Sequence, residues 1–436
     1  MSPDLIIWIF VIWFAGFLIL GQPVATVLMG AGLVGVMLWA GPPVLRGMVG
    51  QDFFFTASNY SLSIIPLYLL MAQLLVRGGV IIDLFRVGHR LAGYRRFPLG
   101  VATIITGGLL GAVSGSGSAS AASLATLASP ELERVGYSKR FSVALAAVAG
   151  SLSAIIPPSL IIIIYGSITM QPIGHMFIGA LIPAALCISV YILCLWLFAE
   201  IRPDAPVGPQ APSAEELAQH RNSIPAFLFV VGLMFVVFGG IYGGVFTVGE
   251  AGALGAFTAL SGMIVMRRVG LRDIGLALTD AVKVTAMLMM LVIGAQVLAR
   301  FLSFSRIPRE LLSLAEPLLA QPLLLLIILM LVIFIAGMIL ESAAVIVLLI
   351  PIILPMLQAA QIDLMWFGVM ASFMIAVGLL TPPVGLSTYA AAAAARVPVT
   401  SIFRSAAPFA ALSALIVTGL MLAFPQLVTW LPSRIR

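Results

Sequence analysis

The sequence has little charge, and this scarcity excludes a water-soluble globular protein. Asp, Glu, Lys and Arg make up 9% of the 436 residues, whereas 62% of the residues are hydrophobic. Soluble domains carry roughly 25% charged residues. Apolar runs of about 20 residues recur, as membrane-spanning helices require, and the shorter alternating segments of a membrane barrel are not seen. The composition predicts an all-α polytopic membrane protein, in which the net charge of +6 concerns orientation and does not indicate nucleic-acid binding.

The sequence also has few cysteines and histidines, and it has no phosphate-binding motif. Cys187 and Cys194 lie on one expected span and are interpreted as small buried apolar residues. The three histidines show no metal-ligand spacing, and without a P-loop the chain is not expected to hydrolyse ATP. An intramembrane enzyme would need a nucleophile with its base, or two facing carboxylates, and the expected spans offer neither. We therefore expect no catalytic residues and no cofactor.

The apolar segments divide into simple spans and two longer segments. The N-terminal stretch lacks a basic region and a cleavage site, so it is interpreted as a retained first span. Ten spans are expected at residues 4–20, 23–40, 58–76, 138–168, 174–199, 222–243, 248–267, 280–299, 363–392 and 400–424. Segments 98–130 and 323–355, about 33 residues each, are too long for one span and too short for two. Each is predicted to be a re-entrant helical hairpin, whose irregular backbone must lie within protein or along a cavity.

The distribution of basic residues predicts the orientation. With ten crossings and two hairpins, the central loop 199–222 lies opposite to both termini. Of the 22 Lys and Arg, 16 (22 − 6) fall on the side of this loop, and six on the other: Arg46, Arg300, Arg306, Arg309, Arg434 and Arg436. The excess of positive charge predicts that the loop is cytoplasmic and both termini are periplasmic or extracellular.

The chain also repeats itself. Three prolines recur 225 residues later, so that Pro130, Pro157 and Pro158 correspond to Pro355, Pro382 and Pro383. The sequence "AQLLVR" (72–77) likewise corresponds to "AQVLAR" (295–300). Because each half holds five crossings and a hairpin, the second half is predicted to be inverted, as in secondary transporters. The expected organisation is a first repeat at 1–199, a cytoplasmic linker at 200–222 and a second repeat at 223–436.

The irregular segments predict a binding site near the middle of the membrane. The first hairpin turns at "SGSGS" (114–118), and the following span breaks at Pro157, Pro158 and Ser159. Their counterparts are a turn near 337–342 and a break at 381–385. Freed carbonyls and hydroxyls at such ends can coordinate Na⁺, and helix N-termini suit a carboxylate. The alternative is that the small residues serve close helix packing.

Charged residues near these segments have their own interpretations. Glu341 at the second hairpin tip either binds a cation or lies at a water-filled mouth, and the sequence does not separate the two. The basic segment with Arg86, Arg90, Arg95 and Arg96 is predicted to be an interfacial arm on anionic lipid head groups of the bilayer.

Five segments together resemble the large membrane subunit (DctM-like) of TRAP transporters, the tripartite ATP-independent periplasmic type. They are residues 63–75, 111–138, 155–166, 350–368 and 378–385. The resemblance implies an elevator-type, Na⁺-driven importer of organic acids in the bacterial inner membrane. It also implies a small four-helix membrane subunit and a periplasmic substrate-binding protein as partners. A stand-alone Na⁺/carboxylate symporter or antiporter of the same architecture is the alternative.

The resemblance also implies site residues. The Na⁺ ligands are expected among Ser114, Gly115, Ser116, Ser118, Pro157, Ser159, Gly337, Glu341, Thr381, Pro383 and Gly385. The substrate contacts are expected at Ser116, Gly117, Ser118, Ser159, Thr381 and Pro382. The family often has aspartate where this chain has Glu341, so this position departs from the pattern.

Overall fold

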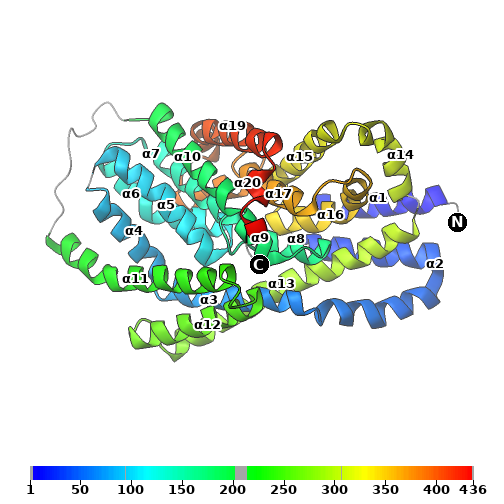
Figure 1. Cartoon of the computed structure of the whole chain (residues 1–436), viewed down its shortest axis with the longest axis horizontal. Coiled ribbons are helices and arrows are strands. Elements are labelled where there is room, and N and C mark those ends of the chain that lie inside the picture. Colours follow the sequence, from blue (N-terminus) through cyan, green and yellow to red (C-terminus); the bar gives the residue numbers. More distant parts are fainter. Residues whose placement is uncertain (1–2, 94, 202–213, 306, 435–436) are drawn as a thin grey trace.

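The computed structural model describes residues 3–93, 95–201, 214–305 and 307–434, and its secondary structure is helical (Figure 1). No strand occurs within these ranges, where Tyr137 and Ile201 form an isolated bridge. The helices of the first half are α1 Pro3–Ile19, α2 Val24–Ala57, η1 Tyr60–Ser63, α3 Ile64–Arg77, α4 Val80–Leu91, α5 Arg96–Ser114, α6 Gly117–Arg134, α7 Lys139–Ser151, η2 Leu152–Ala154, α8 Leu160–Thr169, α9 Ile173–Gly179 and α10 Leu181–Phe198.

The second half has the same succession of long helices, tight turns and interrupted helices. Its elements are α11 Ala214–Tyr242, α12 Val248–Val265, α13 Leu271–Phe304, α14 Ile307–Leu319, α15 Pro322–Ile339, α16 Ser342–Ala359, α17 Leu364–Gly378, α18 Leu386–Ala395, α19 Val399–Ala423, α20 Gln426–Thr429 and η3 Pro432–Arg434. Of the predicted linker 200–222, residues 202–213 lie outside the described ranges.

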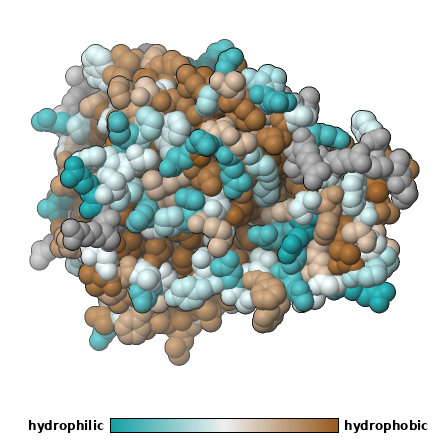
Figure 2. Space-filling view, turned by 45° about the vertical axis from the view of Figure 1, so that its right-hand side comes forward, coloured by the Kyte–Doolittle hydropathy of each residue, from teal (hydrophilic) through white to brown (hydrophobic). Residues whose placement is uncertain are grey.

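The surface is that of a membrane protein. Within the described ranges, nine helices are long and apolar enough to cross a bilayer. Large hydrophobic side chains are exposed on several of them, including Phe54 on α2 and Phe235 on α11, and Trp8 is exposed on the shorter apolar helix α1. Figure 2 shows hydrophobic residues gathered toward the top and the bottom of the visible face, with polar and intermediate residues across its middle. The predicted all-α polytopic class is confirmed.

Two helices of 34 residues, α2 and α13, pack side by side along the lower part of Figure 1. Glycine permits their close approach, because a Cβ atom at Gly32 would lie 2.8 Å from Cγ1 of Val297. The sequence prediction placed the end of the second span at residue 40, and the helical conformation is indeed interrupted at Gly41, whose φ is +84°. What the prediction did not include is the second helical segment, which begins at the two prolines after Gly41 and continues across this kink to Ala57.

Three ion pairs connect α2, α3, α4, α13 and the turn between α12 and α13. Arg77 at the end of α3 pairs with Asp280 of α13, and Arg268 pairs with Asp83 of α4. Arg300 of α13 binds Asp52 of α2 through two hydrogen bonds, Nε to Oδ2 at 2.8 Å and Nη2 to Oδ1 at 3.0 Å. We call the unit formed by α2, α3, α12 and α13 the scaffold.

The hairpins and interrupted helices form a second, densely packed unit, which we call the hairpin unit (α5–α8 and α15–α18). Helix α6 packs on α7 and α18, and α16 packs on α8. All residues of α7 from Phe141 to Ser151 are buried. A Cβ atom at Gly107 of α5 would lie 2.4 Å from the Ala149 carbonyl oxygen, and one at Gly111 would lie 2.3 Å from Cα of Ser153. Hence α5 contacts the backbone of α7 and η2 directly.

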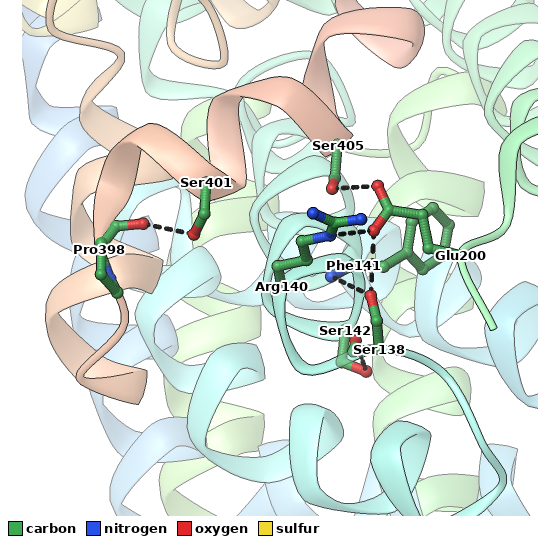
Figure 3. Close-up of polar contacts among 8 residues, drawn as sticks. All are labelled: Ser138, Arg140, Phe141, Ser142, Glu200, Pro398, Ser401 and Ser405. Carbon is green, nitrogen blue, oxygen red and sulfur yellow. Dashed lines mark hydrogen bonds and ion pairs between the residues drawn. The ribbon is translucent and has the colours of Figure 1, made fainter. Parts of the chain in front are cut away.

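A carboxylate at one end of the hairpin unit connects three helices (Figure 3). Glu200, just after α10, accepts hydrogen bonds from Ser138 Oγ at 3.1 Å, from Ser405 Oγ at 2.5 Å and from Arg140 Nε. The Ser138 backbone N–H also donates to the Glu200 carbonyl oxygen, at 2.8 Å. The beginning of α7, the end of α10 and α19 are thereby connected.

Candidate functional site

The first hairpin tip is built from glycine and serine. Helix α5 ends at Ser114, whose side chain lies outside the described part of the structure, and Gly115 follows at φ +64°. This left-handed conformation favours glycine and lets the chain reverse within two residues. Ser116 then caps α6, its hydroxyl oxygen accepting from the Ala119 N–H at 3.5 Å and lying 3.4 Å from Ser118 Oγ.

The second hairpin tip uses a carboxylate in place of the serine cap. Helix α15 ends at Ile339, and Glu341 caps α16, its Oε2 accepting from the Ala343 N–H at 2.9 Å. The turn lies at 340–341, inside the predicted segment 337–342. Glu341 therefore has a definite structural role at the N-terminus of α16, whose partial positive charge favours a carboxylate.

The two helix breaks lie at 155–159 and 379–385, and both Pro-Pro bonds are cis. The first break is buried at Pro157 and Ser159, whose hydroxyl donates to the Ala154 carbonyl oxygen at 2.6 Å. The second break is exposed at Pro382 and Pro383. At that break Thr381 Oγ1 donates to the Val377 carbonyl oxygen at 3.0 Å.

Each hairpin meets the break of its own repeat, and the first tip also meets the break of the other. A Cβ atom at Gly337 would lie 3.1 Å from Cα of Ile375, and the Gly385 N–H donates to the Met338 carbonyl oxygen at 2.9 Å. A Cβ atom at Gly117 would lie 3.1 Å from Leu379 Cδ1 and 3.2 Å from Ser387 Oγ. The interrupted segments of both repeats are therefore in contact around the first tip.

A cavity of about 380 Å³ lies between the two tips and the scaffold, and we call it the tip cavity. Five predicted site residues line it: Gly115, Ser116, Gly117, Ser118 and Glu341. The other predicted residues with described side chains, which do not line it, are Pro157, Ser159, Gly337, Thr381, Pro382, Pro383 and Gly385. The structure thus brings the first tip and Glu341 to one space, while the predicted residues of the breaks do not line it.

Sequence reasoning missed several polar residues of this region. Gln73 on α3 lines the tip cavity, as do Ser120, Ser123 and Ser342. Ser387 is fully buried against Gly117, and its hydroxyl has no hydrogen-bond partner in the described part of the chain. The repeated "AQ" of 72–77 and 295–300 was a usable signal for Gln73. No local pattern marks Ser387, because its proximity to Gly117 depends on how the repeats pack.

The chemistry of the tip cavity suits a small anion together with a cation. Helices α6 and α16 both begin at its wall, and N-terminal N–H groups with their partial positive charge attract carboxylates. At α16 this carboxylate is that of Glu341, so the start of α6 is the one open to an anion. Hydroxyl oxygens of Ser116 and Ser118 and the carboxylate of Glu341 are hard ligands of the kind that alkali cations take. Among the described residues, no cluster of His, Cys, Asp and Glu provides a transition-metal site.

Comparison with known proteins identifies a family for this chain. Residues 11–427 match the family described as "Tripartite ATP-independent periplasmic transporter, DctM component". The C4-dicarboxylate TRAP transporter large permease protein of Pseudomonas aeruginosa is 29% identical, over 92% of this chain and 91% of its own length. The ectoine TRAP transporter large permease protein of Halomonas elongata is 28% identical, over 95% and 96%. The crystal structure of the Alcanivorax borkumensis YdaH transporter shares the fold, with a TM-score of 0.66 over 88% of this chain and 89% of that one at 14% identity.

Proposed function

This chain belongs to the DctM family of tripartite ATP-independent periplasmic transporters, and we propose that it imports an organic acid by coupling it to Na⁺. Members of this family are transport permeases and not enzymes, and they work in tripartite systems for organic acids. The observation that carries the proposal is the tip cavity, where the starts of α6 and α16 meet Ser116, Ser118 and Glu341 beside the scaffold.

The proposed substrate is a carboxylate. The relatives are named for C4-dicarboxylates and for ectoine, and carboxylate is the group that these compounds share. In this chain, the N–H groups at the start of α6 are the natural donors for it, whereas the start of α16 is capped by Glu341. The proposed substrate contacts are Ser116, Gly117, Ser118, Ser159, Thr381 and Pro382.

The proposed coupling ion is Na⁺, held in two groups of ligands that follow the repeats. One group is Ser114, Gly115, Ser116, Ser118, Pro157 and Ser159, and the other is Gly337, Glu341, Thr381, Pro383 and Gly385. Freed carbonyls of the breaks and the hydroxyls beside them supply the oxygen atoms. The inward Na⁺ gradient and the membrane potential supply the energy, about 2.3 kcal/mol per charge per 100 mV.

The proposed movement is of the elevator type. The hairpin unit, with parts from both inverted repeats (1–199 and 223–436, joined by 200–222), carries ion and substrate past the fixed scaffold. Its dense packing supports its movement as one body, and the Glu200 hydrogen bonds connect α10 and α19 to it through the start of α7. We place the chain in the inner membrane with both termini in the periplasm, together with a small four-helix membrane subunit and a periplasmic substrate-binding protein.

The test is uptake of labelled organic acids into proteoliposomes that contain the chain, its small subunit and its binding protein. We expect uptake to require an inward Na⁺ gradient and no ATP. Glu341→Gln keeps a capping oxygen but removes the charge, so it should lower uptake and raise the Na⁺ concentration for half-saturation. Glu250→Gln is the matched control, because Glu250 also caps a helix, α12, but lies away from the cavity.

Three results would contradict the proposal. Uptake that is unchanged when choline replaces Na⁺ would show that Na⁺ is not the coupling ion. Uptake that requires ATP would exclude this class of mechanism. Uptake that proceeds equally without the binding protein would favour a stand-alone symporter.

A further inference from the structure

A second cavity, of about 240 Å³, lies between the scaffold and helix α8, and we call it the Arg300 cavity. Its polar lining comes from α2, the turn before α3, α8 and α13. The residues are Asp52, Thr56, Asn59, Ser167, Gln296 and Arg300. Like the tip cavity, it is bounded on one side by the scaffold and on the other by the hairpin unit, here through Ser167 of α8.

The two cavities are built from equivalent positions of the two repeats. Leu69 and Gln73 line the tip cavity, and the residues 223 positions later, Val292 and Gln296, line the Arg300 cavity. A second set is related by 228 positions, so that Thr56 and Asn59 correspond to Val284 and Met287. The offset of the first set is that of "AQLLVR" and "AQVLAR". Each cavity is therefore lined by one member of each set, so the scaffold surface of the tip cavity and that of the Arg300 cavity are equivalent between the repeats.

The ion pairs beside the cavities follow the same relation. Arg77 and Arg300 are 223 positions apart, and their partners Asp280 and Asp52 are 228 apart. Each pair joins an arginine of one repeat to an aspartate of the other. In an inverted repeat such equivalent features lie toward opposite faces of the membrane. On the orientation proposed above, Arg77 is near the cytoplasm and Arg300 is near the periplasm.

The scaffold surface of the Arg300 cavity is more polar than that of the tip cavity. Where the tip cavity has Val284 and Met287, the Arg300 cavity has Thr56 and Asn59. The side-chain amide of Gln296 has no hydrogen-bond partner in the described part of the structure, and that of Asn59 uses only its oxygen, which accepts from the Ser61 N–H at 3.0 Å. Arg300 is 57% exposed although it binds Asp52, which is 15% exposed.

We propose that the Arg300 cavity is the periplasmic vestibule of the transporter, and that Asn59, Gln296 and Arg300 receive the substrate carboxylate there. The proposal rests on the proposed function, because it assigns where the substrate binds in the other conformation of the same transport cycle. Amide N–H groups and a guanidinium are the donors that recognise a carboxylate. In the other conformation the first tip faces Gln296 in place of Gln73, and the substrate passes from this vestibule to Ser116 and Ser118.

The first experiment measures uptake by the complete transporter carrying Gln296→Met, which keeps the size of the side chain and removes its donor. Losing one such contact, worth about 1.4 kcal/mol, raises the half-saturating concentration of the acid about tenfold. The maximal rate and the Na⁺ dependence should stay near those of the wild type. Gln358→Met is the matched control, because Gln358 is an exposed glutamine on α16 outside both cavities.

The second experiment measures access to the same position by labelling the thiol of Gln296→Cys. The two native cysteines are buried, so they give a low background for a membrane-impermeant maleimide. We expect labelling from the outside, and labelling several-fold slower when Na⁺, the acid and the loaded binding protein are present. Gln358→Cys should show no such protection.

The outcomes separate this inference from the proposed function. If wild-type uptake requires Na⁺ but Gln296→Met keeps the wild-type half-saturation, the vestibule assignment is wrong. It is also wrong if Gln296→Cys reacts only from the cytoplasmic side, or equally with and without substrate. If the wild-type protein itself shows no Na⁺-dependent uptake, the proposed function fails first, and the vestibule fails with it.

Discussion

The contact between α5 and η2 predicts that one added methyl group at Gly111 will damage the site. A Cβ atom there would lie 2.3 Å from Cα of Ser153, and this neighbour is backbone that cannot rotate away. Carbon atoms in ordinary contact lie about 3.5 Å apart or more, so α5 and η2 must separate by about 1.2 Å. Because Gly111 lies one turn before the first tip, this displacement reaches Gly115 and Ser116.

The energetic terms of Gly111→Ala have opposite signs. Alanine stabilises a helix by about 1 kcal/mol relative to glycine. Overpacking a dense interior costs about 1–3 kcal/mol, and a contact with backbone belongs at the upper end. We therefore expect a net loss of about 2 kcal/mol, seen as a melting temperature lower by about 2 °C or more in detergent. Since a displacement of about 1 Å in a functional site can cost about 100-fold, uptake should fall more than tenfold.

Gly232→Ala provides the matched control for this prediction. Gly232 lies within α11, and a Cβ atom there would have no neighbour within 4 Å. The same chemical change should therefore leave uptake unchanged and raise the melting temperature slightly. The reasoning is refuted if Gly111→Ala melts and transports like the wild type, or if both variants behave alike.

Three further predictions concern carboxylates. Burial opposes ionisation of Glu200, but hydrogen bonds from its serine and arginine partners outweigh it and lower its pKa. A lowered pKa stabilises the folded state above the unfolded value of about 4.5, and the effect is lost as the pH falls through the folded value. The melting temperature of Glu200→Gln should therefore be lower than that of the wild type at pH 7. The difference between the two melting temperatures should narrow when they are measured at successively lower pH, down to pH 4. Asp83 is 4% exposed beside Arg268, so Arg268→Ala should cost about 3–5 kcal/mol in a denaturation assay, and adding Asp83→Asn should recover most of it. Glu341→Asp should retain part of the Na⁺ dependence that Glu341→Gln loses, as measured by uptake against Na⁺ concentration.

Much of the helix pattern could be predicted because the residues that end a membrane helix lie at that end in the sequence. The predicted turn 114–118 contains the observed end of α5 at Ser114 and the start of α6 at Gly117. Proline pairs marked both breaks for the same reason, since each proline removes a backbone donor and clashes with the preceding turn. The interruption after residue 40 was predicted, but the helical segment that follows it to Ala57 was not, because Gly41 and the prolines after it are compatible both with a helix end and with a kink.

The site was less predictable because it depends on contacts between distant residues. The glycine and serine residues of the first tip could be identified from composition, and Glu341 from its charge in an apolar segment. Ser387 could not, since only the packing of α18 against α6 brings it to Gly117. The ion pairs of Arg77 and Arg300 also cross between repeats, and nothing near either arginine in the sequence indicates its partner.

The unbroken helix α13 has a consequence for the surrounding lipid. Between Lys283 and Arg300 its stretch free of charged side chains is about 24 Å long at 1.5 Å per residue. The hydrocarbon layer of a typical bilayer is about 30 Å thick, so acyl chains beside this helix must compress or the two basic side chains must stretch toward the head groups. Reconstitution into lipids of graded chain length should therefore change turnover, and phospholipids with shorter tails should suit this protein better than those with longer ones.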